Sequence, residues 1–317
     1  MINLDVIVVG ELNVDALFSE LQQGFPVPGS DKPAGNFVLE LGSASAMVAA
    51  NLSSLGLSVG FVGKTGNDQF GRFVLDSLQD CGVDTSQIQL SKNIKTGITA
   101  VLNHGDERAS VTYKGDSKSW RIEDIDLDNL KGARHLHVSA DYLRPELSKD
   151  CRDIFLSAKK KGISTSLDAN WESAQYWEES SFDVLAAVDV FFLNESEAMT
   201  ISGSDDLTVA LELLSSYVNT VVIKRGHSGC IARQDSTSAQ VDGLPIVPVD
   251  IVGVGSGFNA GFIAKYLMGC SLNICLNFGN LCGAYSTQKS GGIAAFQDQS
   301  SFKQFLETYS TEESRVS

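Results

Sequence analysis

The sequence has 317 residues, of which 43% are hydrophobic and 20% charged, and its formal net charge is −15. This composition can bury a large core, and it excludes a disordered acidic chain and a membrane protein, because no apolar run approaches the ~18 residues that span a bilayer. The negative charge argues against a nucleic-acid-binding protein, which would carry clustered Lys and Arg.

The N-terminal segment, residues 1–10, reads MINLDVIVVG and has no basic residues before its apolar stretch. We therefore expect a first β-strand at Leu4–Val9 and no signal peptide. The six cysteines form no CxxC pair, and most lie in apolar segments. They predict buried, reduced thiols and a cytoplasmic location.

Short apolar runs rich in Val and Ile alternate with amphipathic segments along almost the whole chain. After the first strand, the expected strands are Val59–Val62, His135–Val138, Ser164–Asp168, Val188–Leu193 and Thr220–Lys224. Helical periodicity occurs, for instance, at Phe70–Cys81, Leu147–Lys161 and Leu207–Val218. Repeated strand–helix–strand units predict an α/β fold with a parallel sheet covered by helices on both faces.

Two stretches, at about 12–36 and 96–116, interrupt this alternation. The first is polar and holds three prolines, and the second alternates in the manner of a hairpin with a turn near His104. We expect them to form a small separate sheet, a lid over the main sheet. No linker divides the chain, so residues 1–310 are expected to form a single domain and residues 311–317 a loose tail.

A glycine-rich segment lies at 249–269, which reads VDIVGVGSGFNAGFIAKYLMG. A strand is expected to end near Asp250, and a helix to begin after Gly253, Gly255 and Gly257. Its buried face would hold Phe258, Phe262, Tyr266 and Leu267. Such a helix start suits a phosphate, because glycines allow close approach and free backbone N–H groups attract anions. The alternative is a tight turn that binds no ligand.

Familiar nucleotide and nucleophile motifs fail at this segment. A GxGxxG fingerprint would need glycine at Phe258, and the near miss to a Walker A motif before Gly63 has Ser58 where glycine is required. A nucleophile elbow around Ser256 would need glycine at Val254 and Phe258. A dehydrogenase would need a fingerprint after the first strand, where residues 10–13 read GELN. These classes are therefore disfavoured.

Polar clusters also follow most of the expected strands. In chain order they read GELNVD at 10–15, GSASAMVAANLSSLG at 42–56, GKTGNDQFG at 63–71, DAN at 168–170, NESE at 194–197, KRGHSG at 224–229 and FGNLCG at 278–283. In open parallel sheets, ligands bind beyond the carboxyl ends of the strands. Asp68 is expected to cap a helix. His135 and His137 are expected to point to opposite faces of their strand, and His137 is a candidate for the pocket.

The order of these clusters resembles the ribokinase-like PfkB family of carbohydrate kinases over nearly the full length. The resemblance implies phosphorylation of a sugar or nucleoside hydroxyl with ATP and Mg2+, in an α/β domain with a β-sheet lid that often mediates dimerisation. Nucleic-acid and membrane partners are not expected.

The resemblance also assigns roles to residues. The substrate site would comprise Asn13, Asp15, Gly42, Ser43, His137 and Asp168. Asn194 and Glu197 would organise Mg2+, and Asp250, with the Val252 carbonyl, would lie near a loop for a monovalent cation such as K+. The nucleotide site would comprise Lys224, Gly226, Gly229 and Asn280. The anion hole for the transferred phosphoryl group would be formed by Gly253, Val254, Gly255 and Ser256.

One position departs sharply from the family element DTxGAGD, whose final Asp is the catalytic base. Residues 250–256 read DIVGVGS, so Ser256 occupies the base position, and Ile251, Val252 and Val254 are bulkier or less polar than usual. Met47 replaces a common asparagine. A positioned base contributes ~10²–10⁴-fold to a rate. A neutral serine cannot supply it near pH 7, although it caps a helix as well as Asp does.

Three interpretations of Ser256 follow. The chain is an impaired kinase that uses another base, with Asp168 as a candidate, or turns over slowly. Alternatively, it is a non-catalytic relative that binds sugar or nucleotide as a sensor or regulatory partner. The third interpretation is a deliberate inactivating change, which leaves the altered neighbours unexplained.

Overall fold

The structure is a computed structural model that describes residues 4–22, 24–104, 107–115, 132–139, 148–175 and 177–310. The expected tail at 311–317 and part of the expected turn after His104 lie outside these residues.

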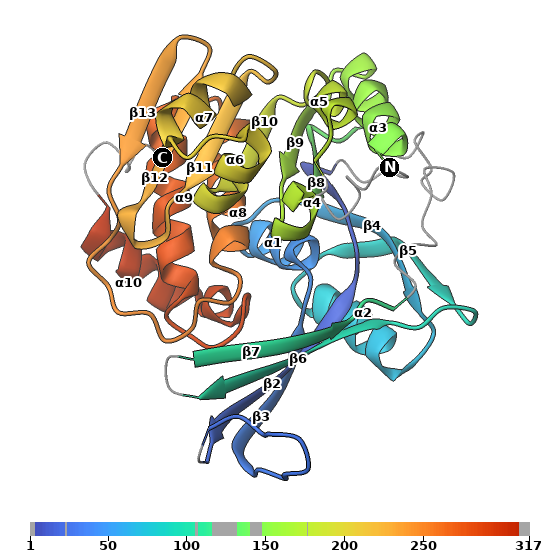
Figure 1. The fold of residues 1–317 in the computed structure, drawn as a ribbon. Helices are drawn as coiled ribbons and strands as arrows, with labels where there is room; N and C mark the ends of the chain where they lie inside the picture. The colour runs from blue at the N-terminus through green and yellow to red at the C-terminus, as the bar shows by residue number, and fades with distance from the viewer. Residues whose placement is uncertain are drawn as a thin grey trace.

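A mostly parallel sheet of nine strands forms the body, in the order β13-β12-β11-β10-β9-β8-β1-β4-β5. Figure 1 shows the body with helices around the sheet. Pairing is parallel from β11 to β5 and antiparallel at β11–β12 and β12–β13. Its strands are β1 (Val6–Val9), β4 (Val59–Gly66), β5 (Asp84–Ser91), β8 (His135–Ser139), β9 (Ser164–Asp168), β10 (Val190–Asn194), β11 (Thr220–Lys224), β12 (Cys230–Gln234) and β13 (Thr237–Val241).

Ten α-helices lie in the described part of the chain. They are α1 (Ala44–Ser54), α2 (Gln69–Asp80), α3 (Ser148–Lys160), α4 (Trp171–Gln175), α5 (Glu179–Leu185), α6 (Glu195–Ser202), α7 (Leu207–Leu214), α8 (Val254–Leu267), α9 (Leu272–Ser286) and α10 (Gln299–Tyr309). Short 3-10 turns lie at Gly226–Ser228 and Ala294–Gln297.

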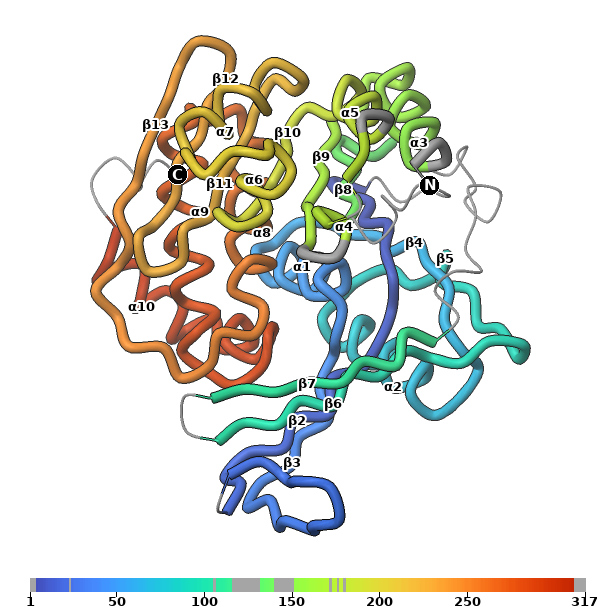
Figure 2. Tube along the Cα trace, viewed as in Figure 1, coloured from blue at the N-terminus to red at the C-terminus, as the bar shows by residue number. Residues whose placement is uncertain are grey.

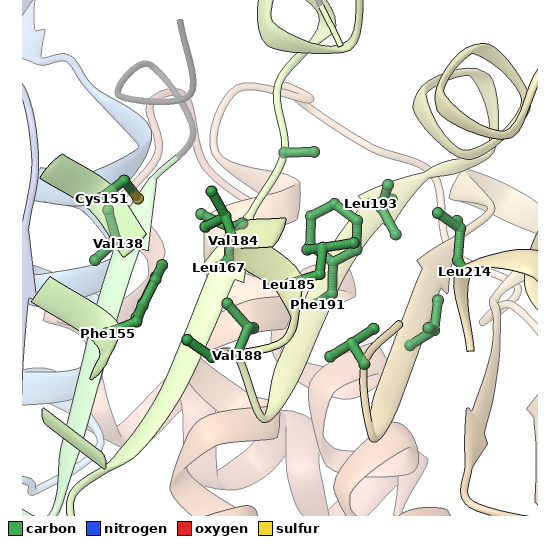
Figure 3. Packing of buried hydrophobic residues seen from close by; sticks show 14 of the residues in the cluster. Val138, Cys151, Phe155, Leu167, Val184, Leu185, Val188, Phe191, Leu193 and Leu214 are labelled. Carbon is green, nitrogen blue, oxygen red and sulfur yellow. The ribbon is translucent and has the colours of Figure 1, made fainter. Parts of the chain in front are cut away.

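Helices cover both faces of the sheet because the strands are apolar on both sides. In β1, Ile7 and Val9 face a core built with α3, α5, α6 and α7, part of which is drawn in Figure 3. Val6 and Val8 face a second core built with α1, α2, α8 and α9. Successive side chains of a strand alternate between faces, so a continuous apolar run fits a sheet buried on both sides.

The lid is a four-stranded sheet in the order β3-β2-β6-β7, and it projects from the body in Figure 2. Its strands are β2 (Asn13–Leu21), β3 (Ala34–Leu41), β6 (Gly97–His104) and β7 (Glu107–Tyr113). The two interrupting stretches therefore supply the expected small sheet, although the first continues to Leu41. The central pair, β2 and β6, is parallel.

A small apolar cluster joins the lid to the body. Leu17 of β2 and Val101 of β6 pack with Met47 of α1 and Val252, and all four residues are at most 5% exposed. Met47 and Val252 are two of the positions where the sequence departs from the family pattern. These two departures, Met47 and Val252, therefore meet in one contact between lid and body.

Several expected elements differ from the structure. No strand ends near Asp250, since residues 242–253 form no regular element, and Pro245 and Pro248 lack the N–H groups that a sheet ladder needs. The polar strands β5, β12 and β13 were not predicted. Expected strand and helix positions elsewhere agree to within a few residues, and Ser164–Asp168 and Thr220–Lys224 agree fully.

Asp68 ties the base of the lid to the body. Its Oδ1 caps α2 by accepting the N–H groups of Phe70 (3.2 Å) and Gly71 (2.9 Å). The same carboxylate accepts the Thr96 hydroxyl at 2.7 Å and the Thr96 N–H at 3.1 Å, just before β6. The expected cap is confirmed. Burial opposes the charged form, but these hydrogen bonds outweigh it and lower the pKa of Asp68.

We predict that Asp68→Ala lowers the free energy of unfolding by about 1–2 kcal/mol at pH 7, the usual cost of a lost N-cap. Urea denaturation measures this value. Asp76→Ala, at an exposed position of the same helix, should change it by less than about 0.5 kcal/mol. Equal effects of the two variants would show that the cap contributes nothing.

Candidate active site

Three polar residues end three neighbouring strands of the main sheet. Asp168 ends β9, Asn194 ends β10 and Lys224 ends β11, and Asn194 pairs with Lys224 in the register. Parallel strands bring their carboxyl ends to one edge, so these residues converge there. The strand-end clusters of the sequence are therefore brought together by the fold.

Lys224 is the centre of this group. Its Nζ lies 2.7 Å from Asp168 Oδ1 and 3.3 Å from Asn259 Oδ1 of α8. The side chains of Lys224 and Asp168 are only 15% and 9% exposed. A Cβ atom at Gly255 would lie 3.4 Å from the ammonium. The lysine charge therefore lies beside the first turn of α8.

Helix α8 begins where the glycine-rich segment predicts. Gly253 is its N-cap with φ 76°, and a Cβ there would lie 2.4 Å from Gly292 Cα, so both the conformation and the close approach require glycine. Ser256 is 5% exposed, and its hydroxyl donates to the Ala44 carbonyl at 3.3 Å. Its neutral side chain thus ties α8 to the start of α1.

Asn194 and Glu197 form a reciprocal capping box at the start of α6. Asn194 Oδ1 accepts the Glu197 N–H at 2.8 Å, and Glu197 Oε2 accepts the Asn194 N–H at 2.7 Å. Burial raises the pKa of Glu197 to about 7, Lys224 opposes this rise, and Asp168 adds to it. This carboxyl is therefore partly protonated near neutral pH.

Asn13 and Asp15 point from the lid toward Gly42. A Cβ at Gly42 would lie 2.6 Å from Asp15 Oδ1 and 2.9 Å from Asn13 Oδ1, so only glycine leaves room for them. Asn13 Oδ1 is buried without a hydrogen-bond partner in the described structure. Burial raises the pKa of Asp15, while the charge of Arg108 opposes this. These side chains therefore place hydrogen-bond acceptors beside Gly42.

Ser43, the residue after Gly42, stabilises the start of α1. It adopts φ 69°, caps α1 by accepting the Ala46 N–H at 3.2 Å, and donates to the Glu11 carbonyl at 2.7 Å. A positive φ is unusual for serine and marks a conformation that its surroundings enforce.

Asp250 and Glu40 lie on either side of the boundary between body and lid. Asp250 Oδ1 accepts the Val252 N–H, and its Oδ2 accepts the Ser290 hydroxyl and the Gly291 N–H. Burial, followed by the charges of Asp250 and Asp15, raises the pKa of Glu40 to about 6. Asp250 therefore shapes the loop before α8 with both of its oxygens.

The expected opposition of His135 and His137 is wrong. Residues two apart in a strand share a face, and both rings contact Ser166 Oγ, at 2.7 Å and 2.8 Å. Both histidines are fully buried, and burial lowers the pKa of each to about 3. His137 Nε2 has no partner in the described structure. His137 is a neutral group beneath the site, near enough to Lys224 to feel its charge.

The candidate nucleotide residues surround the loop after β11. Gly226 is exposed with φ 55° and open space around it. Gly229 is buried with φ 83°, and a Cβ there would lie 2.0 Å from the Val241 carbonyl. Asn280 Nδ2 of α9 donates to the Asp242 carbonyl at 2.9 Å. Thus Asn280 holds the 241–243 segment, and Gly229 lets that segment approach closely.

Asn259 and Glu40 were not among the site residues predicted from the sequence. Asn259 lies three residues after Ser256, one helical turn along α8, so its position was available from helical periodicity. Glu40 lies in β3, beyond the stretch at about 12–36 that was expected to join the small sheet. No local sequence pattern marked it as a site residue. In the described part of the chain, no group of three His, Cys, Asp or Glu side chains could hold a metal ion by itself.

The fold and the comparison with known families place the chain among the phosphotransferases. The pfkB family carbohydrate kinase model matches residues 3–299, so the chain belongs to this family of sugar kinases. The probable fructokinase-6 of Arabidopsis thaliana chloroplasts is 27% identical over 312 residues, covering 92% of this chain and 79% of that protein.

Solved structures show the same ribokinase-like fold. Arabidopsis thaliana ribokinase, complexed with ribose and ATP, superposes with a TM-score of 0.83 at 23% identity, covering 96% of this chain and 99% of that one. An E. coli protein provisionally assigned as ribokinase II, complexed with ATP and Mg2+, gives 0.82 at 22% identity with the same coverage. None of the described helices is long and apolar enough to cross a membrane.

The raised pKa of Glu197 predicts a pH-dependent stability. Between the ordinary glutamate pKa of 4.5 and about 7, the folded protein holds a proton that the unfolded chain releases, so stability falls as pH rises. Relative to Glu197→Gln, the wild type should lose about 3 kcal/mol between pH 4.5 and 7.5. Urea denaturation across this range tests the prediction. Glu212→Gln, at a side chain 63% exposed, is the control, and parallel curves for the wild type and Glu197→Gln would contradict it.

Proposed function

We propose that this chain phosphorylates a hydroxyl group of a sugar with ATP, and that turnover is slow because position 256 lacks a carboxylate. The observation that carries the proposal is the placement of the Lys224 ammonium beside the start of α8. A cation at the positive end of a helix is unfavourable unless an anion joins it. The transferred phosphate group of ATP is such an anion, and Asp168 balances Lys224 until it arrives.

Mg2+ fits the residues at the end of β10. Mg2+ retains several waters and takes few protein carboxylates when it binds with phosphates. The capping box engages Glu197 Oε2 and leaves Oε1 free of a described hydrogen bond. Asn194 and Glu197 would hold the hydrated ion, which would neutralise charge on the phosphates when bound.

The remaining residues bind and orient the substrates. Asn13 and Asp15 accept hydrogen bonds from the sugar hydroxyl groups above Gly42. Backbone N–H groups of the turn from Gly253 to Ser256 surround the transferred phosphate group, since the first four N–H groups of a helix have no partner within it. Phosphoryl transfer depends mainly on such positioning and charge stabilisation, which Ser256 leaves intact.

The second candidate function is that of a non-catalytic relative that binds sugar or nucleotide as a sensor. Two observations favour it: Ser256 donates to a backbone carbonyl, and Met47 and Val252 make the lid contact apolar. The third interpretation, a deliberate inactivating change, accounts for Ser256 but not for these neighbours.

A monovalent cation such as K+ would bind near the loop before α8. Because both Asp250 oxygens accept hydrogen bonds from loop atoms, the loop carbonyls, including that of Val252, would be the ligands. A cytoplasmic location is favoured by the six free cysteines, since a reducing compartment keeps thiols unpaired.

The lid has one apolar face that points away from the site. The register places Phe37, Val111 and Tyr113 on the face opposite Asp15 and Leu17, and their side chains are 56%, 71% and 55% exposed. Exposed apolar patches of this kind mark protein interfaces. The lid edges, β3 and β7, also offer unpaired backbone groups. A second copy of this chain would cover both features, giving a homodimer.

The proposed activity is tested by ATP-dependent product formation with fructose, ribose and adenosine, with and without K+. We predict slow phosphorylation of at least one acceptor, and an increase in kcat of about 10-fold or more in Ser256→Asp, because a positioned base contributes ~10²–10⁴-fold. Ligand affinity is measured in parallel by calorimetry. Binding without turnover in both proteins would support the sensor. Fast turnover that Ser256→Asp leaves unchanged would refute the account of the base.

The proposed dimer is tested by sedimentation velocity. We predict that Val111→Glu converts a dimer into a monomer, because it buries a charge in the interface. Val209→Glu places the same charge on α7, where Val209 is 50% exposed, and should leave the dimer intact. A monomeric wild type at micromolar concentration would rule out the lid dimer.

A further inference from the structure

The reaction needs a proton acceptor that Ser256 does not provide. Its hydroxyl is neutral, and it donates to the Ala44 carbonyl. The inference below rests on the proposed function, since it concerns how the sugar hydroxyl loses its proton. The candidate acceptors are the other carboxylates of the site.

Three carboxylates near the site are engaged elsewhere. Asp250 accepts hydrogen bonds from loop atoms through both oxygens. Glu197 Oε2 closes the capping box of α6. Asp15 belongs to the lid and points at Gly42. Each of these groups has a role in holding a loop, a helix or a substrate hydroxyl.

Histidine is the usual general base of enzymes, yet His137 is unsuited. Burial, with the added charge of Lys224, lowers its pKa to about 3, so it binds a proton weakly. Its Nδ1 contacts Ser166 at 2.8 Å, and the ring lies within the buried face of the sheet.

Asp168 differs from all of these groups. Its Oδ1 lies 2.7 Å from Lys224 Nζ, the ammonium that stands beside the first turn of α8. Asp168 is 7% exposed, and its Oδ2 has no hydrogen-bond partner in the described structure while remaining reachable by solvent. One oxygen thus binds the lysine, and the other is available.

We propose that Asp168 is the proton acceptor of this kinase in place of the missing carboxylate at position 256. The sugar O–H bond breaks and its proton passes to Asp168 Oδ2. The sugar oxygen bonds to the γ-phosphorus of ATP, and the bond from that phosphorus to the β,γ-bridging oxygen breaks, leaving ADP. Lys224 stays beside the phosphate throughout.

An aspartate paired with a lysine is adequate for this chemistry. The phosphoryl transition state is loose, and the base of protein kinases is also an aspartate. Asn259 has a positioning role, because its Oδ1 accepts from Lys224 Nζ at 3.3 Å on the α8 side. The lysine is thereby held between the sheet and the helix, and Asp168 keeps its orientation when the phosphate arrives.

The test is a double-mutant cycle of Asp168→Asn and Ser256→Asp, with kcat measured for the best acceptor. Asp168→Asn preserves shape but removes the proton acceptor, so we expect kcat to fall about 10²-fold or more in the wild-type background. In the Ser256→Asp background, the same change should cost less than about 10-fold, because a carboxylate at 256 takes the proton instead. ATP affinity, measured by calorimetry, confirms that each variant retains its site.

The matched control is Asp76→Asn, at an exposed position of α2, which should leave kcat unchanged. If Asp168 only positions Lys224, the loss will be equal in both backgrounds, and the inference is overturned. An unchanged kcat in Asp168→Asn overturns it as well. Failure of the proposed function looks different, since then neither the wild type nor Ser256→Asp phosphorylates any acceptor.

Discussion

The buried contact among Lys224, Asp168 and Asn259 is the interaction on which the site depends. A buried ammonium is costly unless hydrogen bonds and an opposite charge compensate for it, and here a strand end and a helix supply both. The contact fixes the distance between the sheet edge and α8. It brings the ammonium of Lys224 beside the first turn of α8, where we propose that the transferred phosphate binds.

In the rest of the site, side chains accept hydrogen bonds from the backbone N–H groups of the turns in which they lie. Asn194 and Glu197 close a capping box, Ser43 caps α1, and Asp250 closes the loop before α8. Side chains that are held in this way keep a fixed geometry before any ligand binds. Preorganised groups of this kind stabilise a transition state without reorganisation at the moment of reaction. The same residues therefore stabilise the fold and shape the site.

Much of this arrangement could be predicted from the sequence. Strands such as Thr220–Lys224 are continuous apolar runs, and the glycines before α8 have a clear physical reason, so both signals are local. The polar strand β5 and the strand β12 lack such a signal, because neighbouring strands decide their pairing. His135 and His137 were expected on opposite faces of their strand, although residues two apart in a strand share a face. The Lys224–Asp168 contact joins residues 56 positions apart, which no local pattern reveals.

The apolar contact of Leu17, Met47, Val101 and Val252 makes its members depend on one another. Asparagine at position 47 alone would place an amide among three buried apolar side chains, which costs free energy without a partner. A polar contact between lid and body would therefore require positions 47 and 252 to change together.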